Sequence, residues 1–183
     1  GKVDIVYSAY SMSAMEFTYD LIYSEPILLA MPADHPLASS MDLSNNSPLT
    51  PYYIKPELVR NCDFIVLIPE QGMGAIARDM FHKYNFNPNI VMETQKHETA
   101  MRLASAGMGM VFTRYGPPLE PLVKPMAYFS IENPIFTRSR GVYYSKYVPL
   151  SEAARCFIHV FNEVYNHESS LKIPDCHLII HPP

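Results

Sequence analysis

FIVLIPEQGMGAIARDMFHKY, residues 64–84, combines the pattern of a buried strand with that of an amphipathic helix. Its first five residues are all apolar, which is typical of a strand that is covered on both faces. Residues 75–84 carry apolar side chains at helical spacing, namely Ile76, Met80, Phe81 and Tyr84. Gly72–Gly74 is the predicted turn between the two elements. The stretch therefore predicts a strand–turn–helix unit.

The same order of elements continues downstream. Ile90–Glu93 predicts a second strand, and a second helix is expected from near Gln95 with Thr94 as its N-cap. Gly107 stands where a glycine commonly ends a helix, and Gly109–Thr113 predicts the next strand. The order β-α-β-α-β predicts parallel strands joined by right-handed crossovers. The chain is thus expected to belong to the α/β class.

The flanking segments add strands and a last helix. Strands are predicted at residues 3–7, 17–23, 27–31, 127–131 and 141–147, and a short helix at residues 55–61. Pro32–Pro36 breaks the third of these strands. Ser151 is the expected N-cap of an amphipathic helix, Glu152–Tyr165, whose apolar side chains recur on one side.

Composition favours a folded domain that does not bind nucleic acid by itself. Of 183 residues, 48% are hydrophobic, enough for a core, and the formal net charge is -4 without a cluster of basic residues. No apolar run approaches the roughly 20 residues that span a bilayer, and no secretory signal is visible. The three cysteines, Cys62, Cys156 and Cys176, are far apart and odd in number, so we expect reduced thiols in a cytoplasmic protein.

Four segments resemble, in order and in approximate spacing, the effector domain of LysR-type transcription regulators. Gly1–Val6 is similar to the family's "G-x-x-D-hydrophobic" strand, and Ser24–Ala38 to the strand that leads into its "D-H-P-L-A" turn. Ala104–Met110 is similar to its "A-A-G-x-G" helix-to-strand turn, and Leu150–Phe157 to its "L-S-x-A-x-x-x-F" last helix. The D-H-P-L-A turn is the most specific of the four. The resemblance covers about residues 1–165.

This resemblance implies a two-lobed α/β fold of the type-2 periplasmic-binding-protein class. Residues 1–33 are expected to form part of lobe one, residues 34–137 lobe two, and residues 138–183 a crossover strand that returns to lobe one with the C-terminal helix and tail. The family's winged helix-turn-helix and linker helix have no counterpart in the sequence. The first strand, helix and second strand of the family's lobe one have none either, so the first lobe is expected to be incomplete.

The resemblance also implies a function without catalysis. A small effector, expected to be an anionic metabolite, would bind in the cleft between the lobes and control DNA binding by the winged helix-turn-helix. The implied partners are the effector, further copies of the chain in a homo-oligomer, and DNA only through that other domain; no cofactor and no membrane partner are expected. The alternative is a solute-binding protein of a transport system, because one fold serves both functions.

Nine residues are the candidates for binding the effector. In this fold the carboxyl ends of strands and the starts of helices face the cleft. Arg114 is the expected anion partner, because a guanidinium group can hold a carboxylate through two hydrogen bonds. An ordinary surface position is the alternative for each candidate. The nine are Ser8, Tyr10, Gln71, Gly72, Met73, Thr94, His97, Thr113 and Arg114.

Two further patterns suggest other chemistry. Gly72–Ala77 fits G-x-G-x-x-A after a strand, and Glu93 follows about 20 residues on, which is the spacing of the dinucleotide-binding fingerprint. A dinucleotide-binding enzyme is therefore a third functional hypothesis. The structural alternative for the glycines is a plain tight turn. The strand-to-helix connection is longer than this fingerprint requires, which favours the plain turn.

Cys176, His177 and His181 are three ligands in one short segment, whereas structural zinc takes four. No metal site is therefore expected.

Overall fold

The computed structural model describes residues 3–9, 15–114 and 121–168, and these residues form two compact units. Unit 1 comprises the described residues up to Glu25 and from Thr137 onward; unit 2 comprises those from Pro26 to Phe136. The chain thus passes twice between the units, as a two-lobed fold requires. Residues 26–33, which we assigned to the first lobe from the sequence, lie in unit 2 because they pair with strands of that unit.

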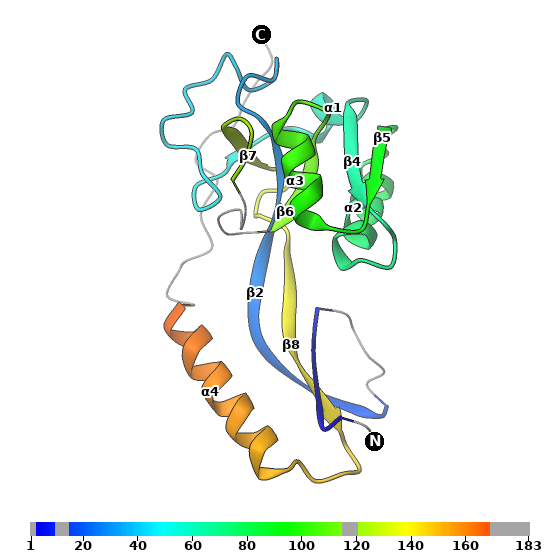
Figure 1. Cartoon of the computed structure of the whole chain (residues 1–183), viewed down its shortest axis with the longest axis vertical. Helices are drawn as coiled ribbons and strands as arrows, with labels where there is room; N and C mark the ends of the chain where they lie inside the picture. Colours follow the sequence, from blue (N-terminus) through cyan, green and yellow to red (C-terminus); the bar gives the residue numbers. More distant parts are fainter. Residues whose placement is uncertain (1–2, 10–14, 115–120, 169–183) are drawn as a thin grey trace. The chain divides into compact units, whose positions relative to one another are not determined.

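Unit 2 contains the parallel strands that the sequence predicts. β4 (Asp63–Leu67) pairs in parallel with β5 (Asn89–Thr94), and Phe64 also pairs in parallel with Met110, directly before β6 (Val111–Arg114). α2 (Gly72–Lys83) and α3 (His97–Ser105) connect these strands (Figure 1). The predicted β-α-β-α-β order is therefore confirmed.

β2 (Phe17–Pro32) is one continuous strand where two strands were predicted. In unit 2 it pairs antiparallel with β6 and with β7 (Met126–Ser130), and β3 (Tyr52–Tyr53), which precedes α1 (Pro56–Val59), pairs in parallel with β7. Pro26 does not interrupt the strand. It removes one backbone donor, but the next donor, Ile27 N–H, bonds the Phe136 carbonyl oxygen at 2.9 Å.

The core of unit 2 lies between these strands and helices α2 and α3. Met31, Phe64 and Phe129 are completely buried. The Phe64 ring meets the Phe81 ring edge-on, with centroids 5.0 Å apart, and stacks on the Phe112 ring at 5.8 Å. This aromatic cluster packs α2 against β4 and β6.

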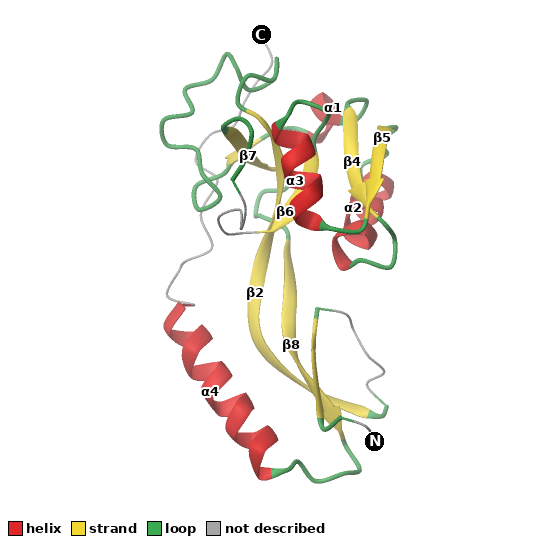
Figure 2. Cartoon of the chain, in the orientation of Figure 1, coloured by secondary structure: helices red, strands yellow, loops and turns green. Residues whose placement is uncertain are grey.

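Unit 1 is an antiparallel sheet with one long helix (Figure 2). β8 (Thr137–Ser145) lies between β1 (Ile5–Ser8) and the first part of β2. The helix, α4 (Glu152–Glu168), begins after Ser151, whose hydroxyl accepts the Ala154 N–H at 3.2 Å; the predicted N-cap is confirmed. Within the described residues, no helix has the length and apolar content needed to cross a bilayer.

The starts of α2 and α3 differ from the prediction. α2 begins at Gly72, so both glycines of the expected turn lie in its first turn. α3 begins at His97, and its N-cap residue is Lys96, which makes no side-chain cap hydrogen bond. Thr94 instead ends β5, and its hydroxyl accepts the Lys96 N–H at 3.4 Å. Strand pairing at Thr94 prevails over its helix-capping tendency.

The end of α3 agrees with the prediction. Gly107 has a φ of 97°, in the left-handed region that glycine adopts without strain. Its N–H donates to the Ala104 carbonyl at 2.9 Å, and the Met108 N–H donates to the Leu103 carbonyl at 3.2 Å. These two bonds form a Schellman motif, which satisfies carbonyls at the helix end and directs the chain into β6.

Gly74 is required for close packing between α2 and β4. A Cβ atom at this position would lie 2.1 Å from the Ile68 carbonyl oxygen and 2.5 Å from that of Leu67. Both obstructing atoms are backbone and cannot rotate away. The second glycine of the G-x-G pattern therefore has a packing role that does not require a bound ligand.

We expect Gly74→Ala to lower the free energy of unfolding by a net ~2 kcal/mol, since the clash outweighs the better helix propensity of alanine. Urea denaturation measures this change. Gly107→Ala is the matched control: its Cβ meets no atom within 4 Å, so only the cost of the left-handed backbone remains, about 1 kcal/mol. Equal or greater stability of Gly74→Ala would contradict the packing role.

The D-H-P-L-A segment forms a tight turn after β2. The His35 N–H donates to the Pro32 carbonyl at 2.9 Å, and the Leu37 N–H donates to His35 Nδ1 at 3.2 Å. Nδ1 must be unprotonated to accept this bond. Burial lowers the pKa of His35 below its ordinary value of 6.5, although the Asp34 carboxylate opposes the shift.

A lowered pKa means that the folded state favours neutral His35. Its contribution to stability is fully present above its unfolded pKa and is lost as pH falls from that value through the lower folded pKa. We expect the free energy of unfolding to decrease between about pH 7 and pH 5, measured by urea denaturation. In His35→Asn, whose amide oxygen can accept the Leu37 N–H without titrating, this decrease should be smaller; an identical pH profile in both proteins would refute the assignment.

Candidate functional site

Most of the predicted site residues lie at one kind of place in unit 2, where a strand ends and the following helix begins. Gln71–Met73 stand at the start of α2, after β4, and Thr94 and His97 stand at the end of β5 and the start of α3. The Ile68 N–H donates to the Thr94 carbonyl at 3.0 Å, so the ends of β4 and β5 are adjacent. The sequence thus identified a continuous edge of this unit, which we call the α2–α3 edge (residues 71–73, 94, 97, 113 and 114).

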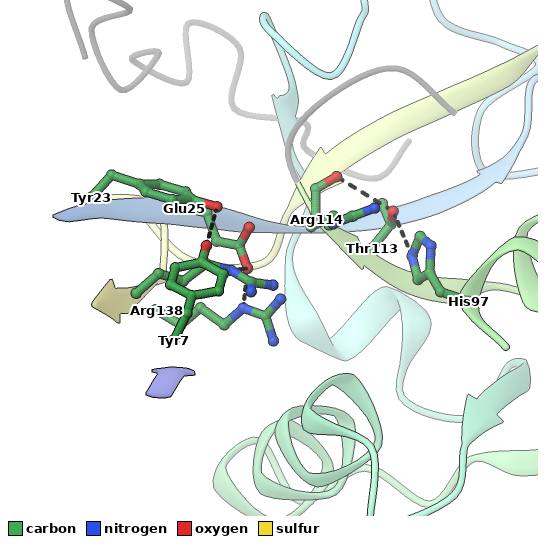
Figure 3. A network of polar contacts seen from close by, with 8 residues as sticks. Tyr7, Tyr23, Glu25, His97, Thr113, Arg114 and Arg138 are labelled. Carbon is green, nitrogen blue, oxygen red and sulfur yellow. Dashed lines mark hydrogen bonds and ion pairs between the residues drawn. The ribbon is translucent and has the colours of Figure 1, made fainter. Parts of the chain in front are cut away.

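His97 and Thr113 are in direct contact at the α2–α3 edge. His97 Nε2 and Thr113 Oγ1 are 3.1 Å apart (Figure 3), and only 3% of Thr113 is exposed. This hydrogen bond joins the start of α3 to the end of β6. Two candidates that are 16 positions apart in the sequence therefore form one polar pair.

Arg114 is the last residue of β6 and pairs with Ile27 of β2. It is partly exposed, and within the described residues its guanidinium group makes no ion pair with a carboxylate. Its neighbour Thr113 is held by His97, so the backbone that carries Arg114 is fixed on both sides. The strand thus fixes the backbone position from which this cation extends.

The helix starts contribute backbone donors. Neither Gln71 nor Lys96 caps its helix with a side chain, so the first N–H groups of α2 and α3 are not satisfied in that way. The Met73 side chain is buried in the core, which leaves only its backbone N–H for any ligand. Glu98 in the first turn of α3 opposes the positive charge there, whereas α2 has no acidic residue in its first turn.

The two remaining candidates belong to unit 1. Ser8 ends β1, is half-buried and pairs with Gly141 of β8. Tyr10 lies outside the described residues. The structure therefore tests neither as a ligand contact, and both stay predictions.

A buried ion cluster in unit 1 was not identified from the sequence. One carboxylate oxygen of Glu25, Oε1, accepts the Nε–H groups of both Arg138 and Arg140 (Figure 3). The available signal was the alternation of two arginines in TRSRG, residues 137–141, which leads into the strand predicted at residues 141–147. Alternation places both side chains on one face of a strand, but it does not reveal the distant carboxylate that pairs with them.

An open groove of about 860 Å³ lies elsewhere in unit 2. Tyr53, Lys55, Tyr84 and Glu132 are among its lining residues, and none of the nine candidates lines it. Glu132 is engaged by Lys83 at 2.7 Å. We therefore regard the α2–α3 edge, with its positioned cation and helix starts, as the better candidate.

The described residues show no group of three or more His, Cys, Asp or Glu side chains that could hold a metal ion. Cys176, His177 and His181 lie outside them. The thiol of Cys62 is half-buried, and burial raises its pKa, so this cysteine is a poor nucleophile. Glu93, the acidic residue of the dinucleotide-like pattern, is paired with Arg78 at 2.7 Å.

The sequence model of the family described as LysR substrate binding domain matches residues 1–166 of this chain. The chain belongs to that family. This confirms both the resemblance seen in the sequence and the expected periplasmic-binding-protein-like α/β fold. A curated relative, the uncharacterized HTH-type transcriptional regulator YybE of Bacillus subtilis (strain 168), is 28% identical over 89 residues. That match covers 49% of this chain and only 27% of the relative.

Solved structures show the same fold at low sequence identity. The CcmR regulatory domain of Synechocystis PCC6803, in complex with 2-PG, has a TM-score of 0.70 at 16% identity, covering 88% of this chain and 73% of that one. The effector binding domain of QuiR, in complex with shikimate, has a TM-score of 0.67 at 16% identity, with 91% and 73% covered. A probable LysR family regulator domain from Rhodococcus sp. RHA1 has a TM-score of 0.70 at 20% identity, with 87% and 74% covered.

The His97–Thr113 contact can be measured by a double-mutant cycle. We expect a coupling energy of about 1 kcal/mol between His97→Ala and Thr113→Val, because either substitution alone removes the hydrogen bond between the two side chains. Urea denaturation of the wild type, the two single variants and the double variant gives this value. Additivity within about 0.3 kcal/mol would show that the two side chains do not interact in solution.

Proposed function

We propose that this chain is the effector-sensing part of a bacterial LysR-type transcription regulator, and that a small organic anion binds at the α2–α3 edge of unit 2. The observation that carries the proposal is Arg114. It is a partly exposed guanidinium group without a carboxylate partner in the described part of the chain, on the strand beside two helices whose starts lack side-chain caps.

The chemistry of this edge suits a carboxylate or a phosphate. Helix starts present backbone N–H groups and a partial positive charge, which stabilise a bound anion. Arg114 adds a full charge and paired donors that match the geometry of a carboxylate. The His97–Thr113 pair supplies further polar atoms beside it. The complexes of related domains with 2-PG and with shikimate support a small molecule as the effector.

The proposal extends to the whole regulator. A winged helix-turn-helix outside this sequence would bind DNA, copies of the regulator would form a homo-oligomer in the cytoplasm, and effector binding would change DNA affinity. The net charge of -4 supports a domain that does not itself grip DNA. The alternative, a transport solute-binding protein, predicts a signal peptide in the upstream reading frame, whereas our proposal predicts a helix-turn-helix there.

A dinucleotide-dependent enzyme is disfavoured by two contacts. Gly74 is used for packing against the Leu67 and Ile68 carbonyls, and the Glu93 carboxylate is engaged by Arg78. The two positions that would serve the pyrophosphate and the ribose in that fingerprint thus have structural partners. We therefore propose sensing without catalysis.

We expect Arg114→Ala to weaken binding of the effector at least about tenfold, since a charge-assisted contact contributes roughly 1.5–3 kcal/mol. A thermal-shift screen of metabolite carboxylates and phosphate esters identifies the ligand, and calorimetry then gives its Kd with the wild type and the variant. Arg60→Ala, at an exposed arginine of the same unit, is the control for general charge effects. If Arg114→Ala binds the ligand within twofold of the wild type, Arg114 is not the anchor.

A further inference from the structure

Unit 1 contains a compact polar cluster formed by Tyr7, Tyr23, Glu25, Arg138 and Arg140 (Figure 3). Glu25 Oε1 accepts the Arg140 Nε–H at 2.7 Å and also accepts the Arg138 Nε–H. The Arg140 guanidinium carbon lies 5.7 Å from the centroid of the Tyr7 ring, and the Tyr7 hydroxyl donates to that of Tyr23 at 3.0 Å. All five residues come from β1, β2 and β8 of this one unit.

The charges of the cluster do not balance. Two guanidinium groups share a single carboxylate, which leaves one net positive charge among side chains that are 10%, 17% and 6% exposed for Arg138, Arg140 and Glu25. A buried charge without a counter-charge is costly. Burial lowers the pKa of Arg138, and the neighbouring Arg140 charge lowers it further, against the favourable effect of Glu25.

The guanidinium groups also retain unused donors. Each arginine has five N–H donors, and Glu25 takes only the one on Nε. Within the described residues the Nη groups of Arg138 and Arg140 have no protein acceptor, and no buried polar side-chain atom there lacks a partner. The Nη groups therefore reach solvent at an otherwise buried position, beside the Tyr7 ring, which is 38% exposed.

We propose that Arg138 and Arg140 form a second anion-binding site, within unit 1 and independent of Arg114, for the phosphate or carboxylate group of a small molecule. The bound group accepts hydrogen bonds from the Nη donors of both arginines and neutralises the excess charge. Glu25 orients the two guanidinium planes by holding their Nε atoms, so Glu25 is a positioning residue that does not touch the ligand. The Tyr7 ring packs against Arg140 and keeps its side chain in place.

The arrangement favours a ligand site over a purely structural ion cluster. The described residues supply one carboxylate for the two guanidinium groups and no acceptor for their Nη donors, so these donors are left to bond with water or with a bound ligand. A small oxyanion supplies both the missing charge and the missing acceptors.

Calorimetric titration of the full chain with inorganic phosphate, and separately with acetate at the same ionic strength in chloride, tests the site and distinguishes the two anion classes. We expect saturable binding of at least one of them. Arg138→Gln and Arg140→Gln should each weaken it about tenfold or more, since each removes a charge-assisted contact. Glu25→Gln should strengthen it several-fold, because removal of the competing carboxylate leaves more positive charge for the ligand. A merely structural cluster predicts no gain in that variant.

Arg60→Gln is the matched control and should bind the anion within twofold of the wild type, whereas Arg114→Gln reports on the α2–α3 edge of unit 2. Loss only in Arg114→Gln would overturn the unit 1 site while supporting the α2–α3 edge. Losses in Arg138→Gln and Arg140→Gln that Arg60→Gln does not show would support the unit 1 site. If a variant fails to fold by circular dichroism, the arginine Nε–H NMR signals of the wild type decide: the anion should shift those of Arg138 and Arg140 but not that of Arg60. Unchanged signals, or no binding of either anion, would refute the proposal.

Discussion

The position of residues Ile27–Met31 of β2 is the constraint on which unit 2 depends. All five are nearly or completely buried, and the strand is hydrogen-bonded to β6 on one edge and β7 on the other. A shift of one residue would turn every side chain of the strand to the opposite face, so the register is strongly specified. Because Ile27 pairs with Arg114, this register also determines where the end of β6 places its guanidinium group.

Each unit combines an apolar framework with cationic groups that the framework cannot neutralise by itself. In unit 2 the cation is Arg114 beside helix starts; in unit 1 it is the pair Arg138 and Arg140, which share Glu25. Strand pairing fixes the backbone positions of all three arginines, which lowers the conformational entropy that an anion-binding site must lose. This preorganisation is the physical basis for assigning a sensing function to the chain rather than a purely structural one.

The G-x-G pattern shows why a short motif needs its structural context. Gly72 and Gly74 lie in the first turn of α2, and Gly74 allows the backbone of this turn to approach the carbonyls at the end of β4. Glycine at such a position is equally suited to a bound phosphate or to tight helix–strand packing. The contacts of Gly74 and the ion pair of Glu93 with Arg78 favour packing here.

Apolar periodicity and turn residues were sufficient to predict the α/β class, the parallel order of β4, β5 and β6, the Ser151 cap and the Gly107 helix end, because these features depend on neighbours within a few residues of the chain. They also predicted the strand ends and helix starts from which the candidates of the α2–α3 edge were chosen, and effector binding at this edge stays a prediction. The continuity of β2 through Pro26, the start of α3 at His97 and the sharing of Glu25 by two arginines over 110 positions away were decided only by the tertiary structure. Such contacts depend on which distant strands pair and in which register, and no local pattern specifies that pairing.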